Sequence, residues 1–304
     1  MWATLEGSCC GKKRNQEEPE EDRGSRIIPR MNVAQYSPSL TLRADGIWAV
    51  DGSNDRVSYP TTGHQVCFEV EGSSFWFQHR NACIAALVEH LPPSGPIFDV
   101  GGGNGVVAAA LSARGWPVVL VEPGVAGCRN AQARGLENVV QSTFEGAAFE
   151  EGVIPAVGLF DVIEHVPDDV EFLRAVALKL SSGGWVYATV PAFNLLWSVD
   201  DEQAGHFRRY SKPQIERVFE SAGFKTIYSS YIFAPLPLGI LLLRSLPSRL
   251  GILRSVSISR TAREHRAGGP LHWAVTLVLK RELRRIPLGR IRFGSTVLVA
   301  ARRD

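Results

Sequence analysis

The sequence predicts an α/β protein built around a doubly wound, mostly parallel sheet of seven strands. Short apolar runs alternate with segments of helical periodicity from residue 97 to residue 190. Near-continuous apolar strands are buried on both faces, which is typical of a parallel sheet covered by helices on both sides. A glycine-rich turn follows the first strand, at residues 101–105. Right-handed crossovers place such a turn at the carboxyl edge of the sheet, where ligands bind.

The elements follow in a regular order. Strands are predicted at residues 97–100, 117–122, 139–143, within 154–163, and at 185–190, 225–233 and 292–300. Helices are predicted at residues 73–91, 105–114, 125–134, 168–180 and 211–222, and a loop at 192–210. Ser74 and Ser211 have N-cap chemistry. Glycines at positions 115, 135 and 223 end three of the helices.

The segments around this core define the remaining organisation. Residues 1–30 are charged, carry almost no core-forming side chains and are predicted to be disordered. Asp-Gly pairs separate short alternating runs and predict a small β-hairpin element over residues 31–72. The ligand-binding domain then covers residues 73–233, and a helical insertion, apolar and then basic, covers 234–290. Residues 291–304 supply the last strand.

Composition and charge limit the function. The 304 residues are 45% hydrophobic with a net charge of +2, values of an ordinary globular protein that predict no particular partner. The five cysteines form no CxxC pair and no metal-like spacing with histidine, so no metal site is predicted. These cysteines, without a basic and apolar leader, predict a cytoplasmic protein with free thiols. The longest apolar run, 231–243, is shorter than the roughly 20 residues that span a bilayer.

The glycine-rich turn differs from a dinucleotide fingerprint. That fingerprint has the spacing GxGxxG, whereas here the glycines are Gly101, Gly103 and Gly105, so the third comes one residue early. Asp99 stands two residues before the first glycine, which favours a ligand with a positive amino group over a pyrophosphate. Glu122 ends the next strand, where a carboxylate can accept hydrogen bonds from both hydroxyls of a ribose.

Two further motifs follow in order: DVIEHV at residues 161–166 and LSSGG at residues 180–184. Together with the glycine turn and Glu122, they resemble the class I S-adenosylmethionine-dependent methyltransferase family of small-molecule type, over residues 76–190 and the last strand. The resemblance implies a Rossmann-like methyltransferase fold with S-adenosyl-L-methionine as cofactor. It implies that residues 99–105 hold the amino acid part of the cofactor and that Asp161 adds to the site. It places Phe144, after Thr143, beside the adenine, where many relatives carry Asp.

The resemblance implies in-line methyl transfer to a small-molecule, lipid-like or glycan-type acceptor. Two histidines are candidate bases, because an unperturbed histidine, with a pKa of about 6.5, suits proton transfer at neutral pH. His165 follows the fourth strand, and its alternative role is to shape the cofactor pocket. His206 lies in the loop after the fifth strand. Its neighbours Arg208 and Arg209 either recognise an anionic substrate or form a structural clasp with the acids at 200–202.

Four residues are candidates for substrate binding. Trp76, His79 and Arg80 lie in the first turns of the helix at 73–91, which predicts a lid over the glycine turn with His79 and Arg80 facing a ligand. The alternative is a helix that packs its aromatic side chains on the core. Tyr210 lies in the same loop as His206.

The insertion at 234–290 has two interpretations. In the first, it caps the active site and lines the binding site of a hydrophobic substrate. In the second, it makes peripheral contact with an anionic membrane surface. Between Arg244 and Arg292 the sequence has 12 basic residues and two acidic ones.

Alternatives to a methyltransferase also stay open. An NAD(P)-dependent oxidoreductase shares the strand, the glycines and the distal acid, and a non-catalytic S-adenosylmethionine-binding protein shares the whole cofactor site. The sequence has no Asn/Asp-Pro-Pro-Tyr motif and no interleaved aromatics, which argues against nucleic acid as a partner. The oligomeric state is left open.

Overall fold

The computed structural model describes residues 31–50, 71, 74–252 and 270–304. The segment 1–30 that we predict to be disordered lies outside the described residues. The same holds for residues 51–70 of the predicted hairpin element and residues 253–269 of the insertion.

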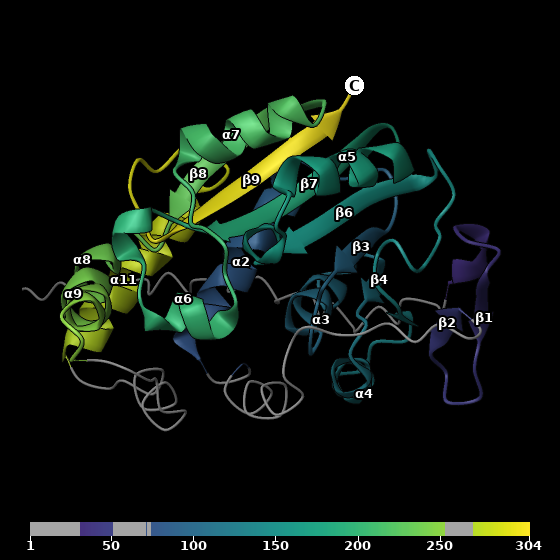
Figure 1. Cartoon of the computed structure of the whole chain (residues 1–304), viewed down its shortest axis with the longest axis horizontal. Coiled ribbons are helices and arrows are strands. Elements are labelled where there is room, and N and C mark those ends of the chain that lie inside the picture. Colours follow the sequence, from purple (N-terminus) through teal and green to yellow (C-terminus); the bar gives the residue numbers. More distant parts are fainter. Residues whose placement is uncertain (1–30, 51–70, 72–73, 253–269) are drawn as a thin grey trace, which may run out of the picture.

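One nine-stranded sheet forms the centre of the fold, in the order β1-β2-β5-β4-β3-β6-β7-β9-β8 (Figure 1). The strands are β1 (Leu40–Leu42), β2 (Trp48–Val50), β3 (Ile97–Val100), β4 (Val118–Val121), β5 (Val139–Gln141), β6 (Ile154–Phe160), β7 (Leu180–Pro191), β8 (Phe224–Ile232) and β9 (Thr296–Arg303). Neighbouring strands from β5 to β7 pair in parallel, and β9 pairs antiparallel with both β7 and β8. The predicted doubly wound, mostly parallel sheet is confirmed, and each of its seven strands is present.

The predicted strand count is too low, because the N-terminal hairpin joins the sheet. β1 and β2 are antiparallel around a turn in which Gly46 has a φ of +83° and Asp45 accepts a hydrogen bond from the Ile47 N–H. β2 then pairs in parallel with β5, through Trp48 and Val140. The hairpin therefore extends one edge of the sheet and is not a separate layer.

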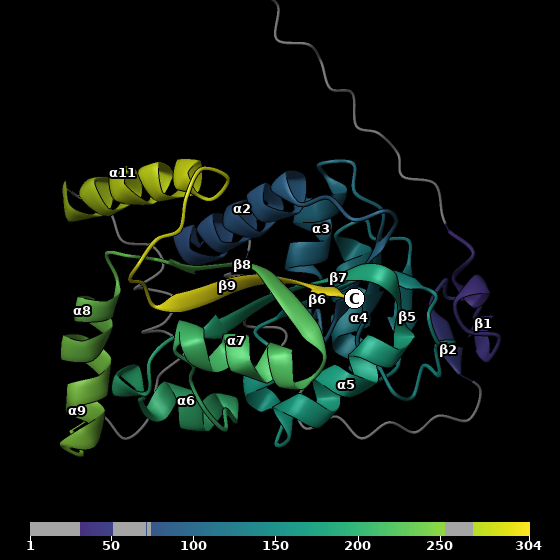
Figure 2. The ribbon, with the colours of Figure 1, turned by 90° about the horizontal axis from the view of Figure 1, so that it is seen from above.

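Helices cover both faces of the sheet (Figure 2). One face carries α2 (Phe75–His90), α3 (Val106–Ser112) and α4 (Val125–Ala133), and the other carries α5 (Asp169–Lys179) and α7 (Lys212–Ser221). Consecutive residues of β3 pack on opposite faces of the sheet. Ile97 belongs to the hydrophobic cluster that includes α2 and α3, and Phe98 to the one that includes α5 and α7. This explains why β3 is apolar at successive positions.

Two predicted strand starts are wrong, and one predicted loop contains a helix. β7 begins at Leu180 and not at residue 185, so the LSSGG segment belongs to the strand. β9 begins at Thr296 and not at residue 292, because residues before it cross over the end of β8. A Cβ on Gly294 would lie 2.1 Å from the Ile232 carbonyl oxygen, so the two backbones touch there. The predicted loop at 192–210 contains the short helix α6 (Val199–Ala204), which a capping box between Ser198 and Asp201 starts.

The described part of the insertion is helical, as predicted. α8 (Pro237–Ile240), η4 (Leu241–Ser245) and α9 (Leu246–Arg249) follow one another without a break, and α11 (Pro270–Arg285) packs on α2. Among the described residues, each helix is too short or too polar to cross a bilayer.

Candidate functional site

The glycine turn joins β3 to α3 at the carboxyl edge of the sheet. Gly101, Gly103 and Gly105 all have positive φ, between +54° and +74°. At Gly105 an added Cβ would lie 2.9 Å from the Cβ of Ala131, so the start of α3 packs directly on α4. The backbone of the turn is thereby fixed from behind, and at Gly103 an added Cβ would meet no described atom within 4 Å.

Asp99 lies under this turn and is 1% exposed. Its Oδ2 has no hydrogen-bond partner among the described residues. Burial raises the pKa of this carboxyl to about 7; the Arg80 charge and a backbone hydrogen bond with Ala108 oppose the rise, and Glu122 adds to it. An unpartnered buried carboxyl is costly, and a cationic ligand group would satisfy it.

Glu122, at the end of β4, ties the turn to the sheet. Its Oε2 accepts from the Gly103 N–H at 3.0 Å, and its Oε1 accepts from the Gly124 N–H at 2.7 Å. A carboxylate oxygen has two lone pairs and can accept more than one hydrogen bond. The predicted ribose contact agrees with this geometry and stays a prediction.

A network that the sequence did not indicate holds the far side of the turn. The buried Glu71 accepts from Asn104 Nδ2 at 3.2 Å and from Arg134 Nη2 at 2.8 Å. Arg134 Nε also donates to the Asn104 carbonyl oxygen at 2.9 Å. Glu71 belongs to the segment predicted as a hairpin, and no local pattern marked it as a partner of the glycine turn.

Arg80 supplies a positive charge opposite Asp99. It contacts Asp161, stacks over the rings of Trp76 and Phe77 at 4.9 and 5.1 Å, and is 6% exposed. Its Nε has no partner among the described residues. Asp161 has a φ of +58°, rare for a non-glycine residue, and accepts from Thr189 Oγ1 at 2.9 Å. Strained backbone of this kind is typical of functional sites.

The two candidate bases lie side by side, with ring centroids 4.7 Å apart. His206 Nδ1 lies 2.9 Å from Asp201 Oδ1, and Arg209 holds the same carboxylate through Nε at 2.7 Å and Nη2 at 3.0 Å. Burial opposes ionisation of Asp201, but the hydrogen bonds from His206 and Arg209 outweigh it and lower its pKa. The predicted clasp is therefore present between Arg209 and Asp201, where it orients His206, whereas Arg208 pairs with Asp169.

Burial lowers the pKa of His165, and the charge of His206 lowers it further. Its neighbour Glu164 is 1% exposed, and burial raises the pKa of its carboxyl, as does the charge of Asp161. The ligand atoms of Glu164, His165 and His206 lie within 4.8 Å of one another, close enough to hold an ion, and Glu164 Oε2 has no hydrogen-bond partner within the described residues.

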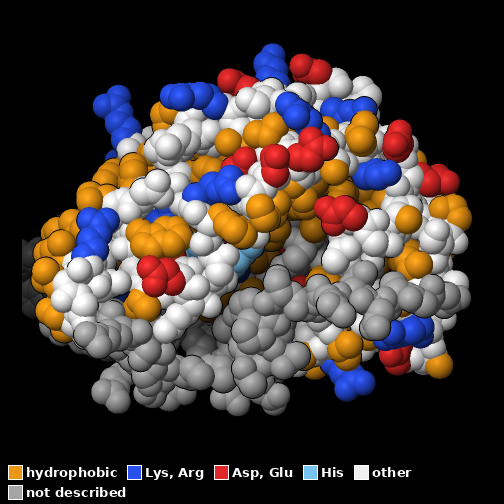
Figure 3. Space-filling model, viewed as in Figure 1, with side chains coloured by type: hydrophobic (Ala, Val, Ile, Leu, Met, Phe, Trp, Pro, Cys, Tyr) orange, Lys and Arg blue, Asp and Glu red, His pale blue; other side chains and the backbone are white. Residues whose placement is uncertain are grey.

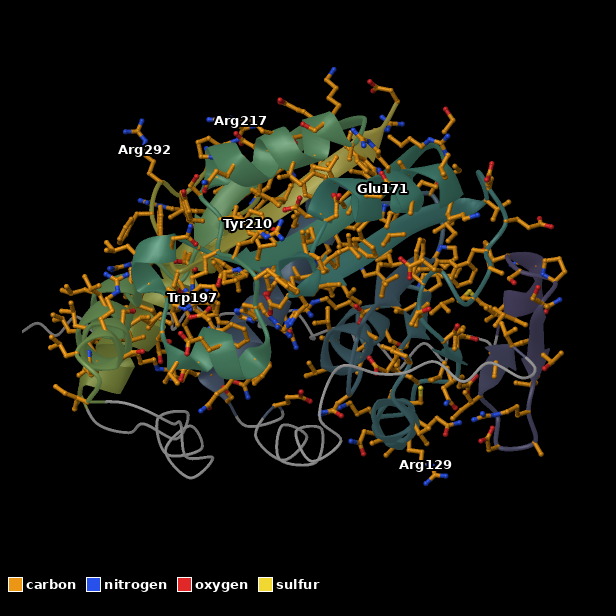
Figure 4. The ribbon with its side chains drawn as sticks, in the orientation of Figure 1. Arg129, Glu171, Trp197, Tyr210, Arg217 and Arg292 are labelled. Atoms are coloured by element: carbon orange, nitrogen blue, oxygen red, sulfur yellow. The ribbon has the colours of Figure 1, made fainter. Side chains whose placement is uncertain are left out.

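Three predicted site residues are engaged with other groups. His79 Nε2 lies 2.7 Å from Oε1 of Glu282 on α11, whose carboxylate also accepts from the Phe233 and Ala234 N–H groups. Cys83, next to His79, could complete an ion site with these two, but hydrogen bonds already occupy the Glu282 carboxylate. The Tyr210 hydroxyl, inside the fold in Figure 4, donates to Asp169 at 2.8 Å. 

Phe144 is 4% exposed and packs on Phe149. The ligand roles predicted for Phe144, His79 and Tyr210 stay predictions.

Comparison with known proteins agrees with this site. A family model described as a methyltransferase domain matches residues 76–229. The ubiquinone biosynthesis O-methyltransferase of Chromobacterium violaceum is 31% identical over 97 residues, covering 30% of this chain and 42% of that protein. The enzyme of the same name from Azotobacter vinelandii is 33% identical over 108 residues, 33% and 47% of the two chains. This chain thus spans less than half the length of these relatives.

Solved structures share the fold. Phosphoethanolamine N-methyltransferase 2 of Haemonchus contortus, solved with S-adenosyl-L-methionine, has a TM-score of 0.50 and 19% identity, covering 84% of this chain and 61% of that one. The match to the family model covers half of the chain, and it includes the glycine turn, Glu122 and the DVIEHV motif. The resemblance is therefore confirmed at the level of the family, its small-molecule type stays a prediction, and the chain belongs to the methyltransferase domain family.

Proposed function

We propose that this protein transfers the methyl group of S-adenosyl-L-methionine to a small-molecule acceptor. The observation that carries the proposal is the pair of opposite charges at the glycine turn. Asp99 has an unpartnered carboxyl oxygen, and Arg80 an unpartnered nitrogen. The amino acid part of S-adenosylmethionine is a zwitterion, so its ammonium suits Asp99 and its carboxylate suits Arg80.

The same charges argue against the oxidoreductase alternative. A dinucleotide would bring its pyrophosphate to the glycine turn, where the Asp99 carboxylate would repel it. Family membership supports the methyltransferase as well, because the matched segment contains this turn. A chain that binds the cofactor without catalysis is the remaining alternative, and the paired His206 and Asp201 favour the enzyme.

The proposed reaction is an in-line displacement. S-Adenosylmethionine, held by residues 99–105 and Glu122, would supply a methyl group activated by its sulfonium sulfur, and attack by an acceptor oxygen would release S-adenosylhomocysteine as a neutral thioether. The hydroxyl proton of the acceptor passes to Nε2 of His206. Asp201 accepts from Nδ1, which fixes the tautomer and stabilises the imidazolium that forms. His165 lies against His206, and its lowered pKa disfavours a second positive charge beside the imidazolium.

We propose that the acceptor is apolar and carries a hydroxyl group. The relatives in Chromobacterium and Azotobacter are named for O-methylation in ubiquinone biosynthesis, which supports this class. In this proposal residues 73–233 bind the cofactor, and residues 234–290 cap the acceptor side and contact a membrane peripherally. The free, buried thiols of Cys83 and Cys128 support a cytoplasmic location.

Calorimetry with three ligands tests the cofactor. S-Adenosylmethionine and S-adenosylhomocysteine are expected to bind the purified chain, and NAD is not. Binding of NAD alone would overturn the proposal.

A variant pair tests the base. His206→Gln is expected to lower turnover by about 10²–10⁴-fold, the usual contribution of a general base, and to leave S-adenosylhomocysteine affinity unchanged. His90→Gln, at the exposed end of α2, is the matched control. Unchanged turnover in His206→Gln would remove the base from the mechanism.

A further inference from the structure

We propose that the helix formed by α8, η4 and α9, with Trp273 of α11, docks on an anionic phospholipid membrane. This inference rests on the proposed function, since the membrane would be the source of the apolar acceptor. The carrying feature is a set of exposed leucines at a spacing of four residues, which we name the leucine stripe: Leu238, Leu242, Leu246 and Leu250.

The helix that carries the leucine stripe has apolar side chains on its outer face as well as on its inner one. Ser245 is fully buried and donates to the Leu196 carbonyl oxygen at 2.8 Å, so a hydroxyl faces the protein. The leucines of the stripe are 39–72% exposed, and Leu243 beside them is 64% exposed. A helix that stabilised only this fold would turn these side chains inward. Apolar surface gathered on one helix face marks an interaction site, unlike apolar residues scattered singly.

Other apolar side chains continue this surface. α8, α9 and the N-terminal end of α11 lie at the same end of the molecule in both ribbon views, opposite β1 and β2 (Figures 1 and 2). Trp273, near that end of α11, is 68% exposed, and Ile252 after α9 is 74% exposed. In the space-filling view, hydrophobic side chains gather over the same end (Figure 3). Tryptophan and leucine on a helix lying flat are typical of interfacial membrane anchors.

Charge makes an anionic bilayer the best-matched partner. From Arg244 to Arg292 the chain has 12 basic residues and two acidic ones. One of these acids, Glu282, is 3% exposed and contacts His79, so it does not offset the basic charge at the surface. Arg249 is exposed on α9, next to Leu250 of the leucine stripe, and Arg281 and Arg285 are exposed in the last turns of α11. Basic residues beside an apolar face attract anionic headgroups, whereas a second copy of the same surface would repel it.

Hydrogen bonds connect the helix of the leucine stripe to α6, which holds the proposed base His206. Arg244 Nη1 contacts Asp200 Oδ2 at 2.9 Å, and Ser248 Oγ accepts from the Val199 N–H at 3.0 Å. Both partners belong to α6, whose next residue, Asp201, holds His206. One helix therefore separates the leucine stripe from the site, and an acceptor leaving the bilayer there would arrive beside His206.

Flotation with vesicles tests the proposal on the full chain. Wild type is expected to float with vesicles of phosphatidylcholine and phosphatidylglycerol, less with phosphatidylcholine alone, and less at high salt. Leu242→Ser/Leu246→Ser is expected to lower the bound fraction at least about tenfold, because two leucines leave the apolar phase. Leu42→Ser/Leu178→Ser removes exposed leucines from β1 and α5 and is the matched control.

A second pair tests the charge. Arg281→Gln/Arg285→Gln is expected to weaken binding to anionic vesicles only, and Arg129→Gln/Arg217→Gln, which project from α4 and α7 (Figure 4), is expected to leave it unchanged. Wild type that stays unbound, or a leucine variant that floats like wild type, would overturn the proposal. The proposal would also be overturned if the wild type were a dimer and the leucine variant a monomer, since the leucine stripe would then bind a second copy of the chain. Normal S-adenosylhomocysteine binding in the same samples separates a failed membrane site from a failed cofactor site.

Discussion

Replacement of Asp99 by Asn is expected to make the ligand-free protein more stable and a poorer binder of its cofactor. The Asp99 carboxyl is fully buried, its Oδ2 lacks a partner among the described residues, and its pKa is raised to about 7 from the ordinary 3.8. Asn keeps the shape of the side chain and cannot ionise. The variant therefore removes the cost of burying a charge and also removes the charge that would face the ligand.

The magnitude follows from proton linkage. Between pH 3.8 and pH 7 the native state keeps a proton on Asp99 that the unfolded chain has released, so this group lowers the stability as pH rises. At 1.36 kcal/mol per pKa unit, the difference between about 7 and 3.8 amounts to about 4 kcal/mol. The free energies of unfolding of Asp99→Asn and wild type should thus diverge by about 4 kcal/mol between pH 4 and pH 8, with the variant more stable at pH 8.

Urea unfolding at several pH values measures the stability change, and calorimetry measures the affinity. Loss of a charge-assisted hydrogen bond of about 1.5–3 kcal/mol weakens S-adenosylmethionine binding by about 10- to 150-fold. Wild type is also expected to release a proton on binding near pH 7, because the ligand cation lowers the pKa of Asp99, and the variant is not. A stability difference that stays constant from pH 4 to pH 8 would refute the reasoning.

Three further predictions concern the turn, the cap and the bases. Gly102→Ala places a Cβ 2.2 Å from Leu120 Cδ1 and is expected to cost about 1–3 kcal/mol of stability and most of the cofactor affinity. Urea unfolding measures the stability and calorimetry the affinity, with the exposed Gly289→Ala as the control. A loss in Gly102→Ala no larger than in this control would contradict the prediction. Glu282→Leu removes the acceptor of His79 and of the Phe233 and Ala234 N–H groups, and each buried group left unsatisfied should cost about 1–3 kcal/mol in thermal or urea unfolding. Dialysis against a chelator is expected to leave turnover unchanged, because His206 and not a metal ion accepts the acceptor's proton. If activity were lost and then restored by a divalent cation, Glu164, His165 and His206 would instead be ligands of that ion.

Much of the fold was predictable because its signals are local. The apolar strands, the glycines that end helices and the serine caps each depend on a few neighbouring residues. The hairpin was recognised from its turn, yet its pairing with β5 depends on residues about 90 positions apart, which no local pattern encodes. The start of β9 was misplaced because Gly294 is set by contact with the distant Ile232.

The site divides in the same way. The glycine turn, Asp99 and Glu122 follow one another at a spacing that the cofactor chemistry demands, so the sequence indicated them together. Glu71 was missed because its partners, Asn104 and Arg134, lie 33 and 63 residues away. The aromatic and polar side chains in the first turns of α2 predicted that His79 and Arg80 both face a ligand. In the structure Arg80 contacts Asp161, whereas His79 contacts Glu282.

That divergence on α2 has a consequence for how the molecule is assembled. The partner of Arg80, Asp161, lies 81 residues further along the chain, and the partner of His79, Glu282, lies 203 residues further. Contacts between such distant positions close large loops and form late in folding. The contacts of the helix that borders the cofactor turn are thus complete only after α11 has docked, and a nascent chain that has not reached Glu282 lacks the partner of the His79 imidazole.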